Sequence, residues 1–291
     1  MTKTIPSAEQ LALFDKKSVE RPVVLFYQFT QRSDDVGEPC KTALTRLAER
    51  HAGQLLWAAD QEQAFVGAVG DYAHACQFHF HSRGDARRFF QDAEHARALE
   101  TLSSVQVTVS SAQPRTVVLM SALLAKLLPW VPFNNDVDPG EEPGVGTSDV
   151  MPTSEAIAKL KAHPKQDTPV VMINWLKFRD EANYAAPTKS VSGKKAYYRY
   201  GKVALLATHS LKAKLIFAAR YQQILVGNDG DPGAGLWDEF ALMQYPGRAT
   251  FMLMASLKRY RRALHHREAG LTENGQGLAI TQPHAEFVWR G

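Results

Sequence analysis

Two stretches of this chain carry the same pattern, and together they decide its fold. Residues 55–67 read LLWAADQEQAFVG, and residues 215–227 read LIFAARYQQILVG. Several residues of the first stretch recur unchanged in the second at a constant offset: Leu55, Ala58, Ala59, Gln63, Val66 and Gly67. The elements predicted around the two stretches follow the same order, so the match indicates an internal duplication rather than a chance likeness of two apolar strands.

The N-terminal copy is predicted to be a ferredoxin-like β-α-β-β-α-β unit. Runs of β-branched and aromatic residues, or alternation of apolar with polar residues, indicate its strands. Apolar residues three or four positions apart indicate its helices. The predicted strands cover residues 23–29, 54–59, 63–69, 75–81 and 105–109, and the predicted helices cover residues 39–52 and 85–99.

The C-terminal copy repeats this order. Its predicted strands cover residues 170–178, 214–219, 223–227, 237–245 and 277–282, and its predicted helices cover residues 193–208, capped by Ser192, and 248–269. We therefore divide the chain into an N-terminal half (1–132), a linker rich in Pro, Gly and acidic residues (133–152) and a C-terminal half (153–291). The N-terminal half ends in an apolar segment that is predicted to form a buried or docking helix over residues 116–128.

The strand at residues 170–178 explains why the unit is duplicated. It reads VVMINWLKF, and both of its alternating sets of side chains are largely apolar. Both faces of such a strand must be covered, because a bare apolar sheet face is unusual on a monomer. Helices cover one face, and the sheet of the other half covers the second. The predicted fold class is therefore α+β: tandem ferredoxin-like units that form an intrachain α+β barrel, with a cavity between the two sheets.

Composition excludes several classes of protein and of partner. The chain has 291 residues, of which 45% are hydrophobic and 22% charged, and its formal net charge is +4. These values exclude a disordered chain, and basic and acidic residues are interleaved, so no nucleic-acid partner is indicated. The two cysteines, Cys40 and Cys76, suit a reducing compartment. No segment has the pattern of a signal peptide or a membrane span, so we expect a cytoplasmic protein. We expect its partner to be a small organic ligand, with a homodimer as one option.

The C-terminal half resembles a bacterial family, the domain of unknown function number thirteen-thirty, over residues 169–283. That family belongs to the dimeric α+β barrel superfamily. The resemblance is carried by residues 170–178, YYRY at 197–200, WD at 237–238, YPGR at 245–248, MASLKRY at 254–260 and REAGL at 267–271. The N-terminal half matches by topology alone and has HSRG at residues 81–84 in place of the Tyr-Pro-x-Arg element.

The resemblance implies a fold and a range of activities. The superfamily includes cofactor-independent monooxygenases, isomerases, cyclases, haem-using enzymes and ligand-binding proteins, among which fold alone does not choose. The first hypothesis is an enzyme that acts without a cofactor on a partly apolar organic substrate in the barrel cavity. The second is a non-catalytic ligand-binding protein. The third is a haem or metal protein that uses His79 and His81, whose spacing places both imidazoles on one side of a strand.

Three residues are candidates for catalysis. Asn174 is the polar residue at the centre of an apolar strand, so it either ties to a loop or holds a substrate carbonyl in the cavity. Tyr245 and Arg248 flank a strand-to-helix turn. A cation in the first helical turn is electrostatically disfavoured, so Arg248 is expected either to pair with a carboxylate such as Asp238 or to bind an anionic substrate.

Four further residues are candidates for substrate binding. Tyr197 and Tyr200 lie three positions apart on one helix face, where they either line the cavity or form part of the core. His209 ends the same helix and can serve there as an acid, a base or a cap. Trp237 begins the next strand and is placed at the edge of the predicted cavity. The first-strand counterpart of Asn174 is Tyr27, whose ring would fill the N-terminal side, so the site is predicted in the C-terminal half.

Overall fold

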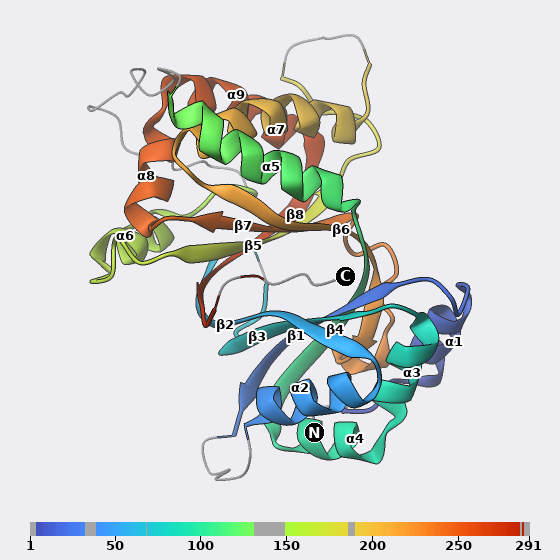
Figure 1. The fold of residues 1–291 in the computed structure, drawn as a ribbon. Helices are drawn as coiled ribbons and strands as arrows, with labels where there is room; N and C mark the ends of the chain where they lie inside the picture. Colours follow the sequence, from blue (N-terminus) through green and yellow to red (C-terminus); the bar gives the residue numbers. More distant parts are fainter. Residues whose placement is uncertain are drawn as a thin grey trace.

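Eight antiparallel strands close into one barrel in the computed structural model (Figure 1). The structure describes residues 4–32, 39–67, 69–130, 149–185, 190–285 and 287. The N-terminal half supplies β1 (Val23–Gln31), β2 (Gly53–Val66), β3 (His74–Phe80) and β4 (Leu102–Ala112), and the C-terminal half supplies β5 (Val170–Phe178), β6 (Lys214–Val226), β7 (Glu239–Tyr245) and β8 (Leu271–Pro283). The order around the barrel is β1-β3-β2-β8-β5-β7-β6-β4, so each half contributes four adjacent strands.

Helices cover the barrel on its two outer faces (Figure 1). Those of the N-terminal half are α1 (Ala8–Asp15), α2 (Cys40–Arg50), α3 (Arg83–Gln91), α4 (Ala93–Glu100) and α5 (Arg115–Leu127), and those of the C-terminal half are α6 (Ser154–Ala162), α7 (Gly193–Ser210), α8 (Arg248–Ser256) and α9 (Lys258–Gly270). Two short 3₁₀ turns, Leu128–Trp130 and Asn228–Gly230, complete the described elements. The tandem α+β barrel predicted from the sequence is therefore the observed fold.

The two repeated stretches are the strands that join the halves. β2 pairs with β3 in its own half up to Asp60, and from Ala59 onward it pairs with β8 of the other half. β6 pairs in the same way with β7 and then with β4. Each has a register irregularity at the same point of the repeat, between Leu55 and Trp57 in β2 and between Leu215 and Phe217 in β6. The duplication is thus visible in the hydrogen-bond register as well as in the residues.

The prediction of two separate strands within each of these stretches was wrong. Residues 54–59 and 63–69 were predicted as separate strands around a turn, but β2 runs unbroken from Gly53 to Val66. The polar residues at 60–62 mark the place where the strand changes partners, and an extended chain can do this without turning. Residues 214–219 and 223–227 are likewise a single strand, β6.

The second helix of each half is interrupted where one continuous helix was predicted. α3 and α4 meet at Asp92, and α8 and α9 meet at Leu257, and both residues have extended backbone angles. Asp92 caps the second segment by accepting a hydrogen bond from the backbone N–H of Glu94. Ser82 caps the first segment, because its hydroxyl accepts the backbone N–H of Asp85.

Apolar side chains from both sheets fill the barrel interior. Phe26 stacks on Trp57 with ring centroids 6.4 Å apart, and it contacts Phe240 at 4.7 Å. Trp175 stacks on Phe240 at 4.2 Å. These rings come from β1, β2, β5 and β7, so they meet across the barrel. The cavity predicted between the two sheets is therefore occupied by side chains.

Helix α5 follows the N-terminal half in the chain but packs on the C-terminal half. It contacts β6 and α7, and Figure 1 shows it beside α7. Ser121 is its one fully buried residue. Large apolar side chains on its other faces remain exposed: Val117, Leu119, Met120, Leu123 and Leu127. The predicted docking helix is thus present, although its apolar surface is only partly covered.

Most of the predicted linker, 133–152, lies outside the described residues. Val150 and Met151, at its C-terminal end, are buried. None of the described helices combines the length and the apolarity that a bilayer span requires.

The helix-covered face of the N-terminal sheet is closely packed. Tyr27 is fully buried between Phe78 and Phe89, and its hydroxyl forms a 2.9 Å hydrogen bond with Nε2 of His95. Burial lowers the pKa of His95 to about 3, so the imidazole is neutral at ordinary pH. Tyr27 and Asn174 are both the fifth residue of a nine-residue strand. The Tyr27 ring therefore occupies, in the N-terminal half, the space that faces Asn174 in the C-terminal half.

We expect the His95→Gln variant to lose stability less steeply with acid than the wild type. His95 has a pKa near 6.5 when unfolded and about 3 when folded, so the unfolded chain takes up the proton first and stability falls as the pH drops below 6.5. One such histidine contributes up to about 1.4 kcal/mol per pH unit. Urea unfolding between pH 7 and pH 4.5 measures the slope. Tyr27→Phe is the control, because burial rather than the hydrogen bond lowers the pKa of His95. An unchanged slope in His95→Gln would contradict the assignment of this pH dependence to His95.

Candidate functional site

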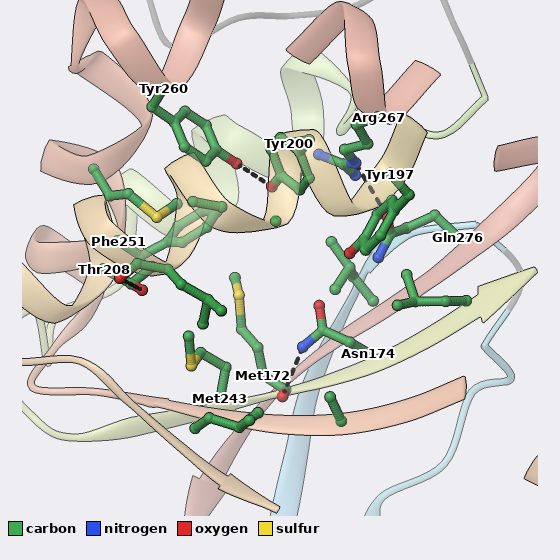
Figure 2. Close-up of a pocket in the computed structure, with 18 of the residues that line it drawn as sticks. Met172, Asn174, Tyr197, Tyr200, Thr208, Met243, Phe251, Tyr260, Arg267 and Gln276 are labelled. Carbon is green, nitrogen blue, oxygen red and sulfur yellow. Dashed lines mark hydrogen bonds between the residues drawn. The ribbon is translucent and has the colours of Figure 1, made fainter. Parts of the chain in front are cut away.

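A cavity lies between the C-terminal sheet and its own helices. Its volume is about 500 Å³. Met172, Asn174 and Leu176 of β5 line its floor, and residues of α7, α8 and α9 form its roof (Figure 2). The alternation within β5 explains the location, because Val171, Ile173 and Trp175 point into the filled barrel while the other set points toward the helices. This cavity is therefore not the one predicted between the two sheets, because it lies on the outer, helix-covered face of the C-terminal sheet.

Asn174 projects from the strand toward the helices (Figure 2). Its Nδ2 donates to the carbonyl of Met172 at 3.1 Å, and no other described residue hydrogen-bonds the side chain. The amide oxygen is thus available to a ligand. The sequence left two roles open for Asn174, a tie to a loop and a contact with a substrate carbonyl. Among the described residues, its side chain makes no hydrogen bond to a loop.

Arg267 and Gln276 lie at the same end of the cavity as Asn174 (Figure 2). Nε of Arg267 donates to Oε1 of Gln276 at 3.0 Å, and another guanidinium nitrogen donates to the backbone carbonyl of Val150. Gln276 is placed opposite Leu176, and Leu278 opposite Asn174, where β8 pairs with β5. Asn174 and Gln276 are therefore diagonal neighbours on one sheet face, about 7–8 Å apart in such a ladder.

Phenol groups line the cavity from this polar end to the opposite one, with Tyr197 beside Arg267 and Tyr245 packed on Phe251 (Figure 2). The hydroxyls of Tyr200 and Tyr260 form a 2.9 Å hydrogen bond, and the guanidinium of Arg267 lies 5.9 Å from the Tyr200 ring. Burial raises the pKa values of Tyr197, Tyr245 and Tyr260 well above the usual phenol value. These tyrosines keep their protons at neutral pH and act toward a ligand as hydrogen-bond donors, not as bases.

The carboxylate of Glu239 at the rim is held by two neighbouring side chains. Glu239 is the one carboxylate among the described residues of the lining. It accepts hydrogen bonds from Lys194 Nζ at 2.7 Å and from the Tyr198 hydroxyl at 2.8 Å. The opposite end is apolar, where Met172, Met243 and Phe251 contribute to the wall. One end of the cavity is therefore polar and the other is mainly apolar (Figure 2).

Arg248 does not line this cavity. Its side chain is fully buried, and it donates to the carboxylate of Glu62 on β2 and to the backbone carbonyl of Lys165. Of the two expectations for Arg248, pairing with a carboxylate is therefore the one observed, with Glu62 in place of Asp238. The pair joins the two halves of the chain. Asp238 instead accepts from Lys177 and from the backbone N–H of Phe178.

His209 and Trp237 also lie away from the lining. Nδ1 of His209 hydrogen-bonds the carbonyl of Leu205 in its own helix, and Nε2 lies 2.7 Å from the Ser121 hydroxyl of α5. The same hydroxyl accepts the backbone N–H of Leu215, so His209 helps to dock α5. Trp237 packs on Trp175, on the barrel side of the sheet. Of the predicted site residues, the structure brings together Asn174, Tyr197, Tyr200 and Tyr245.

The candidate metal or haem ligands are on the other half of the chain. His79 and His81 lie on or beside β3 with ring centroids 5.1 Å apart, and burial lowers the pKa of His79 to about 4. Within the described ranges, no group of three His, Cys, Asp or Glu side chains is placed to hold a metal ion. The described lining of the C-terminal cavity contains neither histidine nor cysteine, so it does not fit a haem held by either ligand.

Four lining residues were missed as functional candidates: Tyr260, Glu239, Arg267 and Gln276. Arg267 lies within the REAGL motif that contributes to the family resemblance, and this was the available signal. Gln276 gave no signal, because its strand begins at Leu271, six residues before the predicted start.

Comparisons with known proteins find likeness at the level of structure. A protein of unknown function from Rhodopseudomonas palustris is 26% identical, with a TM-score of 0.41, over 48% of this chain and 100% of its own. A provisionally assigned monooxygenase from Lactobacillus acidophilus is 10% identical, with a TM-score of 0.40, over 91% of this chain and 94% of its own. A mutant chlorite dismutase from Candidatus Nitrospira defluvii is 13% identical, with a TM-score of 0.43, over 92% and 94%.

These structural likenesses are distant and do not assign a reaction. No protein-family model matches the chain, and no curated protein matches it. The resemblance of the C-terminal half to a family therefore stands on the quoted residues alone.

Replacing Arg248 should lower stability and leave the cavity intact. We expect Arg248→Met to reduce the free energy of unfolding by about 2–3 kcal/mol, because it leaves the Glu62 carboxylate and the Lys165 carbonyl without their charged donor. Arg220→Met, at an exposed position of β6, is the control and should change stability by less than about 0.5 kcal/mol. Chemical denaturation measures both variants. A fully stable Arg248→Met protein would show that the ion pair between the halves contributes nothing.

Proposed function

We propose that the protein is an enzyme that converts a small, partly apolar organic molecule in the C-terminal cavity without a dedicated cofactor. The observation that carries this proposal is the polarity of the cavity, in which an apolar chamber of about 500 Å³ ends in Asn174, Tyr197 and Arg267. A few convergent polar groups in an apolar chamber are typical of small-molecule sites. The resemblance of the C-terminal half to the domain of unknown function number thirteen-thirty is consistent with this proposal.

The polar end is suited to stabilising an oxyanion. The second N–H of Asn174 Nδ2, the Tyr197 phenol and the Arg267 guanidinium are donors, and they lie in a buried chamber where such hydrogen bonds are strong. A substrate carbonyl held there would lose an adjacent proton more readily, because the resulting enolate oxygen is stabilised. Glu239 is the candidate acceptor for that proton. Oxygenation, isomerisation and cyclisation can each begin from such an anion.

The second candidate is a ligand-binding protein with no turnover. The pairing of Glu239 with Lys194 and Tyr198 favours it, because an engaged carboxylate is a weaker base. To separate the two, the compound that copurifies with the protein is identified by mass spectrometry and is then supplied in excess in aerated buffer. An enzyme converts the compound. The product of an oxygenase has gained oxygen, and the product of an isomerase or cyclase has the same mass as the compound. Recovery of the unchanged compound would overturn the enzymatic proposal.

Filling the cavity from α7 should abolish binding without damaging the fold. Gly201 lines the cavity, and a β-carbon built there meets no heavy atom within 4 Å. We expect Gly201→Phe to weaken binding of the copurified compound by more than about tenfold, since its ring takes the volume the ligand needs. Removing a helical glycine should itself stabilise α7 slightly, by less than the roughly 0.5–1 kcal/mol that separates Gly from Ala, because Phe is a weaker helix former than Ala.

Leu206→Phe is the matched control, because Leu206 lies on the same helix but is exposed and outside the lining. Isothermal calorimetry and thermal unfolding measure the two variants. Unchanged binding in Gly201→Phe would place the ligand elsewhere.

A further inference from the structure

The charge of Arg267 is buried without a counter-ion among the described residues. The side chain is 4% exposed, and its two hydrogen bonds go to neutral oxygens of Gln276 and Val150. No described carboxylate lies within ion-pair distance of it. Glu239, the carboxylate of the lining, is engaged by Lys194. A buried charge is normally paired, because removing it from water is costly.

Arg267 also differs from the other buried arginine of this half. Arg248 is equally inaccessible, but it meets the carboxylate of Glu62. Arg267 instead faces a chamber whose described lining provides Asn174, Gln276 and several phenols, none of which carries a negative charge at neutral pH. Lys202 also lines the cavity, but it is exposed to solvent, so Arg267 is the buried positive charge of the described lining and lies at one end of an apolar space.

From this arrangement we infer that the cavity selects an organic monoanion whose acidic group pairs with Arg267 and whose apolar body extends toward Met172, Met243 and Phe251. The inference rests on the proposed function and names its substrate class. The hydrogen bonds to Gln276 and Val150 fix the guanidinium plane, so it is oriented before the ligand arrives. Tyr197 and Asn174 add neutral hydrogen bonds to the same acidic group.

A pair of fluorescent probes that differ in one acidic group tests this. 8-Anilino-1-naphthalenesulfonate is an apolar anion, and N-phenyl-1-naphthylamine has the same ring system without the sulfonate. We expect the wild-type protein to bind the anion at least about tenfold more tightly than the neutral probe, as a charged hydrogen bond would give. Equal affinities for the two probes would overturn the inference without any variant.

The variants then assign the preference to Arg267. Arg267→Gln keeps a donor for the Val150 carbonyl but removes the charge, so it should weaken the anionic probe about tenfold or more and the neutral probe less than about twofold. Arg267→Lys keeps the charge and should retain most of the preference. An equal loss for both probes in Arg267→Gln would mean that the residue only shapes the cavity, and would overturn the inference.

Gly201→Phe separates this failure from failure of the proposed function. It should weaken both probes, because both occupy the chamber. If neither probe binds the wild type, or if Gly201→Phe leaves both unaffected, then the cavity is not the ligand site and the proposed function fails as well. If Gly201→Phe blocks both probes but the anion has no advantage, only the assignment of the substrate class fails.

Discussion

The division of β2 and β6 between two sheets is the constraint on which the rest of this structure depends. Each strand pairs with its own half along its first part and with the other half along its second. Because β2 meets β8 and β6 meets β4, the ring closes and no sheet edge is left unpaired. Open edges are prone to pair with other chains, and closure removes them. Neither half could satisfy its edge strands alone, so the duplication and the closed barrel are one feature.

Closure also decides where a ligand can go. Once the two sheets face each other, aromatic residues of both halves fill the space between them, with Phe26, Trp57, Trp175 and Phe240 in mutual contact. The candidate ligand cavity lies instead between the C-terminal sheet and its own helices. In the N-terminal half this layer is filled by Tyr27 and its neighbours. The smaller Asn174 stands at the equivalent strand position in the C-terminal half, where the cavity is found.

Two buried arginines of the C-terminal half show how similar residues acquire different roles. Arg248 and Arg267 both lie on the helices that follow β7, and both are almost inaccessible. Arg248 points toward β2 and finds Glu62 across the boundary between the halves. Arg267 points toward β5 and β8, where the described residues offer it only neutral partners. The first side chain contributes to holding the halves together, and the second leaves a charge for the cavity.

The sequence alone is enough to predict the duplication, the ferredoxin-like units, the barrel and the two-faced character of residues 170–178. These follow from local periodicity, because alternation along a strand assigns each side chain to a face without knowledge of its partner. It also singled out Asn174, Tyr197, Tyr200 and Tyr245, which do line one cavity. Only the tertiary structure decided which face holds the cavity and which arginine reaches it. Arg248 meets Glu62 across 186 residues of chain, and no local pattern encodes a contact of that span.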